Sequence, residues 1–88
     1  MVILKVKKID GKLNIIGKNL RKYRQLRGYT LRQFSVKLEL YGLTMYHTDI
    51  YNIEHGLKTV RDFEVKGFCK ALNITLDNLY ENTDKYYE

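Results

Sequence analysis

Apolar residues recur at helical spacing through most of the chain, and glycines and capping residues separate the runs. A first helix is predicted over about residues 15–27, with Asn14 in position to cap its start and Gly28 after its end. Thr30 and Gln33 have the spacing of a capping box, in which each side chain satisfies a free backbone N–H of the first turn. A second helix is therefore predicted to begin at this box.

Three further helices follow from the same signals. The second helix is expected to reach about residue 41, before Gly42, and a third to reach about residue 55, before Gly56. Asp62 is expected to cap a fourth helix, and Thr75 a short fifth one. The pattern predicts an all-α domain of five helices over residues 14–80.

The two ends of the chain lack this helical pattern. Apolar and basic residues alternate around Val2 to Val6, and Asp10-Gly11 is a favoured pair for a tight turn. Residues 1–13 are therefore predicted to be a strand-like arm, a short N-terminal β-strand or hairpin. Residues 81–88 are polar and rich in tyrosine, and are expected to be a frayed tail.

Charge is distributed unevenly along the 88 residues, whose net charge is +6. Residues 1–32 hold ten Lys or Arg against one Asp, a net charge of +9, and the remaining 56 residues carry −3. This asymmetry favours a polyanionic partner such as nucleic acid, although a soluble surface with uneven charge would also produce it. No apolar run is long enough for a membrane span, and the start lacks a signal-peptide core, so a cytoplasmic protein is expected.

Side chains that could support catalysis are few and scattered. His47 and His55 are eight positions apart, with no cysteine or carboxylate set at ligand spacing. The single cysteine, Cys69, lies on the inward stripe of the fourth predicted helix, and no glycine-rich phosphate loop is present. We therefore expect no enzyme activity, no metal and no cofactor.

The stretch from Ile16 to Leu79, about 64 of the 88 residues, resembles the Cro/repressor-type (Xre-like) helix-turn-helix family in four ordered segments. They are Leu20-Arg21-x-x-Arg24-x-x-Arg27-Gly28-Tyr29-Thr30, Phe34-Ser35-x-x-Leu38, Ile50-Tyr51-Asn52-Ile53-Glu54-His55-Gly56 and Ala71 to Leu79. The resemblance implies a five-helix, repressor-like helix-turn-helix domain.

Three features depart from the family pattern. Phe34 and Ile50 are sixteen positions apart, which is more than is usual in the family and indicates a variant with a longer turn, within residues 39–45. Leu31 stands where the family often has a glutamine that touches DNA, and Tyr46 where a smaller capping residue usually begins the recognition helix.

The resemblance also implies a function and a site. The function is sequence-specific binding of double-stranded DNA by a repressor-like transcriptional regulator of phage or bacterial type. Arg24 and Glu54 are expected to form an ion pair between the first and third helices. The expected base contacts are His47, Thr48, Tyr51 and Asn52, and the expected phosphate contacts are Arg24, Arg32, Tyr46, His55 and Lys58.

Two other functions remain open from the sequence. One is a protein-binding adaptor or antitoxin-like module that uses the same fold. The other is RNA binding, although the aromatic and basic sheet motifs that stack single-stranded bases are absent. A homodimer is expected, because one recognition helix touches too few base pairs to find a site in a genome. Either Val2 to Val6 or Leu76 to Tyr87 is expected to form its interface.

Overall fold

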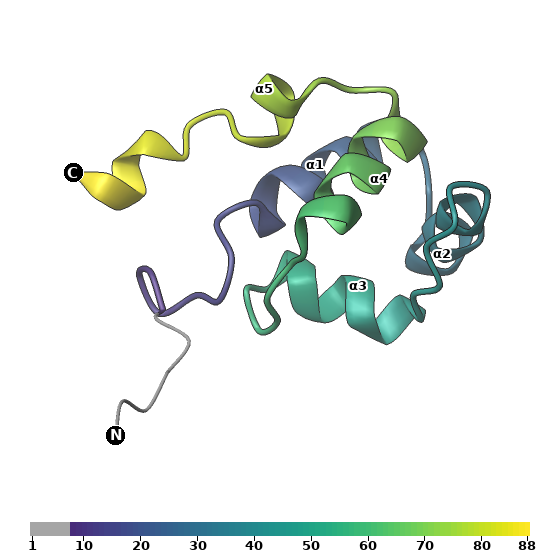
Figure 1. Ribbon diagram of the computed structural model, residues 1–88, viewed down its shortest axis with the longest axis horizontal. Coiled ribbons are helices and arrows are strands. Elements are labelled where there is room, and N and C mark those ends of the chain that lie inside the picture. The colour runs from purple at the N-terminus through teal and green to yellow at the C-terminus, as the bar shows by residue number, and fades with distance from the viewer. Residues whose placement is uncertain (1–7) are drawn as a thin grey trace.

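The computed structural model describes residues 8–88, and helices account for most of them (Figure 1). In chain order these are α1 (Gly17–Leu26), α2 (Leu31–Glu39), α3 (His47–Glu54), α4 (Asp62–Leu72), α5 (Leu76–Leu79) and a 3₁₀-helix (Asp84–Tyr87). The described part of the chain contains no β-strand, only an isolated bridge between Ile9 and Lys12. It is all-α, as predicted.

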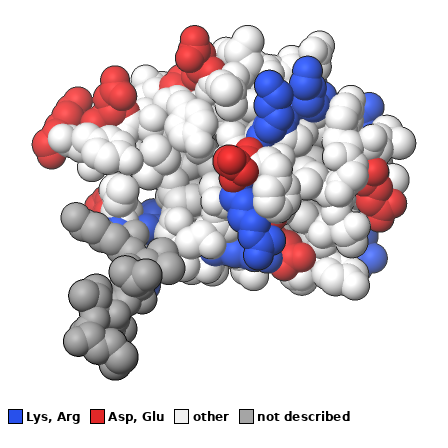
Figure 2. All heavy atoms as spheres, viewed as in Figure 1, with Lys and Arg blue, Asp and Glu red and all other residues white. Residues whose placement is uncertain are grey.

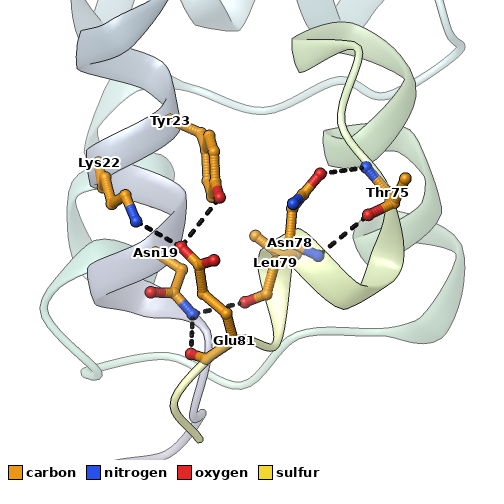
Figure 3. Close-up of polar contacts among 7 residues, drawn as sticks. All are labelled: Asn19, Lys22, Tyr23, Thr75, Asn78, Leu79 and Glu81. Carbon is orange, nitrogen blue, oxygen red and sulfur yellow. Dashed lines mark hydrogen bonds and ion pairs between the residues drawn. The ribbon is translucent and has the colours of Figure 1, made fainter.

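Two capping boxes begin helices where the sequence predicted them. At α2, Gln33 N donates to Thr30 Oγ1 over 3.1 Å and Thr30 N donates to Gln33 Oε1 over 2.9 Å. Thr75 and Asn78 exchange the same two bonds at α5 (Figure 3). The predicted cap of α4 is wrong by one position: Asp62 is the first helical residue.

The core gathers around α4, which crosses in front of α1 in Figure 1. Its inward face packs against the buried faces of α1, α2 and α5, and Cys69 is buried there as the sequence predicted. The largest fully buried side chains, from all five helices and the residue before α1, are Phe34, Phe68, Ile16, Leu20, Leu38, Ile50, Ile53, Leu72 and Leu79.

The connection between α2 and α3 runs over residues 40–46 and belongs to the core. Leu43 and Met45 are buried, and the Ser35 hydroxyl donates to the Met45 carbonyl oxygen. Gly67 on α4 makes room for Leu43, since a Cβ at Gly67 would lie 2.2 Å from Leu43 Cδ1. Helix α2 ends at Glu39, two residues earlier than expected, in a turn where Gly42 has a φ of 78° and Leu43 N donates to the Leu38 carbonyl oxygen over 3.1 Å.

The two ends of the described chain are also ordered by hydrogen bonds. Asp10 and Gly11 form the predicted tight turn, with φ angles of 52° and 71°, between Ile9 and Lys12. The predicted strand at Val2 to Val6 lies outside the described residues. The expectation of a frayed tail is wrong, because the tail begins with contacts to α1 and continues into the 3₁₀-helix.

Candidate nucleic-acid interface

The third helix buries one face and exposes the other. Ile50 and Ile53 are fully buried, whereas the four predicted base contacts, His47, Thr48, Tyr51 and Asn52, are exposed or half-buried. Their spacing places these four on neighbouring positions of one helical face. Within residues 8–88 the side chains of His47, Thr48 and Asn52 form no hydrogen bond, so their donors and acceptors are available to a ligand.

The start of α3 is fixed by Asp49. Its Oδ2 atom accepts from the Tyr46 backbone N–H over 3.0 Å, and its Oδ1 atom accepts from Lys58 Nζ, also over 3.0 Å. The Lys58 ammonium, and after it the Tyr46 N–H, holds the pKa of Asp49 below its usual value. The carboxylate on this face is therefore compensated by Lys58, which stays 44% exposed.

The predicted phosphate contacts lie around this face. Tyr46 is exposed at the start of α3, and Arg32 is exposed in the first turn of α2. His55 stacks its ring on Tyr51 with 4.0 Å between ring centroids. The His55 Nδ1 atom lies 2.8 Å from the Tyr51 carbonyl oxygen, so the two residues form one joined surface at the end of α3.

Arg24 and Glu54 meet in a buried ion pair between α1 and α3. Arg24 Nε lies 2.6 Å from Glu54 Oε2, and Arg24 Nη2 lies 3.0 Å from Glu54 Oε1. Arg24 Nη1 also donates to the Tyr29 carbonyl oxygen over 2.8 Å. The expected ion pair is present, and each of the three guanidinium nitrogens donates one N–H inside the domain; a phosphate contact of Arg24 stays a prediction.

Asn14 positions α3 in a way that the sequence analysis missed. Its Oδ1 atom accepts from the backbone N–H groups of Ile16 and Gly17, but α1 begins at Gly17 with Ile16 as its N-cap, two residues later than predicted. Its Nδ2 atom also donates over 2.9 Å to the carbonyl oxygens of Ile53 and Lys58. One side chain thus joins the start of α1, the end of α3 and the loop that follows.

The C-terminal segment is held on α1 by a second polar cluster (Figure 3). Asn19 Nδ2 donates over 2.8 Å to the carbonyl oxygens of both Leu79 and Glu81. The Glu81 carboxylate accepts from Lys22 Nζ and, over 2.9 Å, from the Tyr23 hydroxyl. The hydrogen bond from Lys22, and after it the one from Tyr23, lowers the pKa of Glu81. The bond between Lys22 and Glu81 also raises the pKa of Lys22. The cluster joins α1 to the segment that follows α5.

On the face shown in Figure 2, several acidic side chains lie towards the C-terminal end, and others lie among the basic side chains that cross the middle. In the part of the chain that the structure describes, no three His, Cys, Asp or Glu side chains are placed to hold a metal ion. No helix among residues 8–88 is long and apolar enough to cross a membrane. Comparisons with protein families, with curated proteins and with solved structures find no match to this chain.

Proposed function

We propose that this protein binds double-stranded DNA in a sequence-specific manner, through a repressor-like helix-turn-helix in which α2 and α3 are the paired helices and α3 reads the bases. The observation that carries the proposal is the exposed polar face of α3, whose opposite face is locked into the core. A B-DNA major groove admits one α-helix, and each base pair displays a distinct set of donors and acceptors there.

The chemistry of the exposed face fits such a role. The Asn52 amide has the donor and acceptor needed to bond an adenine edge at two points, and Thr48 offers a hydroxyl and a methyl group. His47 and Tyr51 add further donors. The compensation of Asp49 by Lys58 limits the repulsion that a free carboxylate would exert on a phosphate backbone.

Phosphate contacts would come from the rim of this face. Arg32, Tyr46, His55 and Lys58 surround α3 and have N–H or O–H donors suited to phosphate oxygens. Arg24 fixes the position of α3, and so of this surface, through its buried ion pair with Glu54. Such contacts supply salt-dependent affinity and set the register, while the bases determine sequence choice.

The biological role that follows is transcriptional regulation of the phage or bacterial type, by a homodimer that reads two half-sites. A protein-binding adaptor would use the same fold but would show no preference among duplex sequences. Selection of bound duplexes from a random library, followed by measurement of the DNA stoichiometry, separates these two roles.

Substitutions then test the division of labour on the selected duplex. Asn52→Ala should weaken binding by about 1–3 kcal/mol and relax the preference at one base pair. Lys58→Ala should weaken binding to matched and scrambled duplexes alike, and Lys66→Ala, an exposed site on α4, serves as the charge-matched control. Equal effects of Asn52→Ala on matched and scrambled duplexes would contradict the base-reading role.

A further inference from the structure

A hollow of about 410 Å³ lies between the N-terminal arm, the first half of α1 and the C-terminal 3₁₀-helix. Lys12 on the arm and Lys18 and Arg21 on α1 line it, and Tyr86 closes one side. His55 also lines the hollow and belongs to the joined surface at the end of α3. The hollow is therefore continuous with the proposed DNA-binding face.

Four cations line this hollow. Lys22 pairs with Glu81, and the Glu54 carboxylate that also lines the hollow pairs with Arg24, whereas Lys12, Lys18 and Arg21 form no ion pair within residues 8–88. Residues 1–7 contain no Asp or Glu that could neutralise them. Asp10 and Glu88 border the adjoining depression that Lys18 shares, but neither forms an ion pair with Lys18.

The arm that carries Lys12 is fixed to the end of α3. Leu13 N donates to the Gly56 carbonyl oxygen over 2.8 Å, and Lys12 Nζ donates to the His55 carbonyl oxygen over 3.4 Å. The stem of Lys12 packs so closely on Gly56 that a Cβ there would lie 2.4 Å from Lys12 Cδ. In Figure 1 the turn of the arm lies beyond the C-terminal end of α3, on the same lower side of the molecule.

We infer that Lys12, Lys18 and Arg21 bind the phosphodiester backbone of the same duplex, on the flank beyond the C-terminal end of α3; this inference rests on the proposed function. Lys12 donates to the carbonyl oxygen of His55, and His55 directly follows α3, so these cations lie beside the end of the helix that is proposed to read the bases.

The test compares two double variants that remove the same charge. Lys12→Gln/Lys18→Gln changes the hollow, and Lys66→Gln/Lys70→Gln changes two exposed residues of α4. On the best duplex selected for the full-length protein, the slope of log affinity against log salt should become shallower by about 1.8 in the first variant, for two lost phosphate contacts, and stay unchanged in the second. Removing the base pairs on one flank of the duplex should weaken binding by the wild type but not by the first variant.

The outcomes separate this inference from the proposed function. If the full-length protein binds no duplex, both fail. If it binds a selected duplex but the two double variants share one salt slope, the proposed function stands and the backbone contact is overturned, which leaves an acidic protein segment as the alternative occupant. Should Lys12→Gln disturb the arm, seen as a lower melting temperature, Lys18→Gln alone gives the same test, with an expected change in slope of about 0.9.

Discussion

Helix α1 carries two ion pairs that begin only two residues apart and lie in opposite environments. Arg24 reaches Glu54 on α3, and these side chains are 10% and 1% exposed. Lys22 reaches Glu81 in the C-terminal segment, where the side chains are 51% and 31% exposed. Removing one partner of a buried pair leaves a charge without water or counterion, whereas exposed partners regain water and contribute little. The first pair therefore fixes α3, and the second holds only a segment on the surface.

The surroundings of the two pairs strengthen this contrast. Close to the Arg24–Glu54 pair, the helices approach so closely that a Cβ at Gly17 would lie 2.5 Å from the Ile53 carbonyl oxygen. Asn14 joins the same two helices and the loop after α3 through four hydrogen bonds. At the C-terminal segment, Asn19 binds two carbonyl oxygens and Glu81 binds two side chains, and none of these bonds reaches α3. Only the first junction determines where the candidate DNA-binding face lies.

The largest effect is expected from Arg24→Met. It should lower the free energy of unfolding by about 3–5 kcal/mol, because the buried Glu54 carboxylate loses its partner. Urea denaturation measures this change. The double variant Arg24→Met/Glu54→Leu removes both charges and should recover most of the loss, since apolar side chains of similar volume often replace a buried pair without cost. A single variant as stable as the wild type would show that the pair does not fix α3.

Gly17→Ala should lower the free energy of unfolding by less, about 1–3 kcal/mol. Its Cβ would meet the backbone oxygens of Ile53 and Glu54 at 2.5 and 2.7 Å. Relief requires α3 to move, so binding to the selected duplex should weaken as well. Gln25→Ala, at an exposed position of the same helix, is the control and should leave the free energy of unfolding nearly unchanged. Equal losses in the two variants would contradict a special role for the α1–α3 junction.

The features that the sequence predicted best depend on residues close together in the chain. The capping boxes at Thr30 and Thr75 require a partner only three positions away, and the exposed face of α3 follows from the helical repeat. The burial of Leu43 depends instead on its packing against Gly67 of α4, which no local pattern encodes. The C-terminal segment was expected to fray, since no local pattern indicates that Glu81 binds Lys22, which is 59 positions away in the chain.

The candidate site shows the same division. The family resemblance predicted the ion pair of Arg24 and Glu54, and it also suggested a phosphate contact for Arg24. In the structure the three guanidinium nitrogens donate to Glu54 and to the Tyr29 carbonyl oxygen. The role of Asn14 at the start of α1 was visible from its place before the helix. Its bonds to Ile53 and Lys58 were not, because they depend on how α3 packs against α1.

The smallest effect on the domain is expected from Glu81→Gln, which keeps the shape of the side chain and removes its charge. The contacts to Lys22 and Tyr23 should weaken, so the tyrosines of the C-terminal segment should become more accessible to chymotrypsin. Urea denaturation and affinity for the selected duplex should stay close to those of the wild type, because the segment lies outside the junction that fixes α3. Glu88→Gln, at an exposed carboxylate, is the charge-matched control and should leave cleavage unchanged.

Acid should reproduce the effect of this substitution in the wild type. The pKa of Glu81 lies below its usual value of 4.5 in the folded state, so its contribution is complete above pH 4.5 and is lost as the pH falls through the lowered value. Cleavage of the wild type by pepsin, which works at low pH, should therefore rise over that range, while Glu81→Gln should already be cleaved readily at its upper end. If Glu81→Gln instead destabilised the whole domain as much as Arg24→Met, the exposed pair would be as important as the buried one, and the contrast between them would not hold.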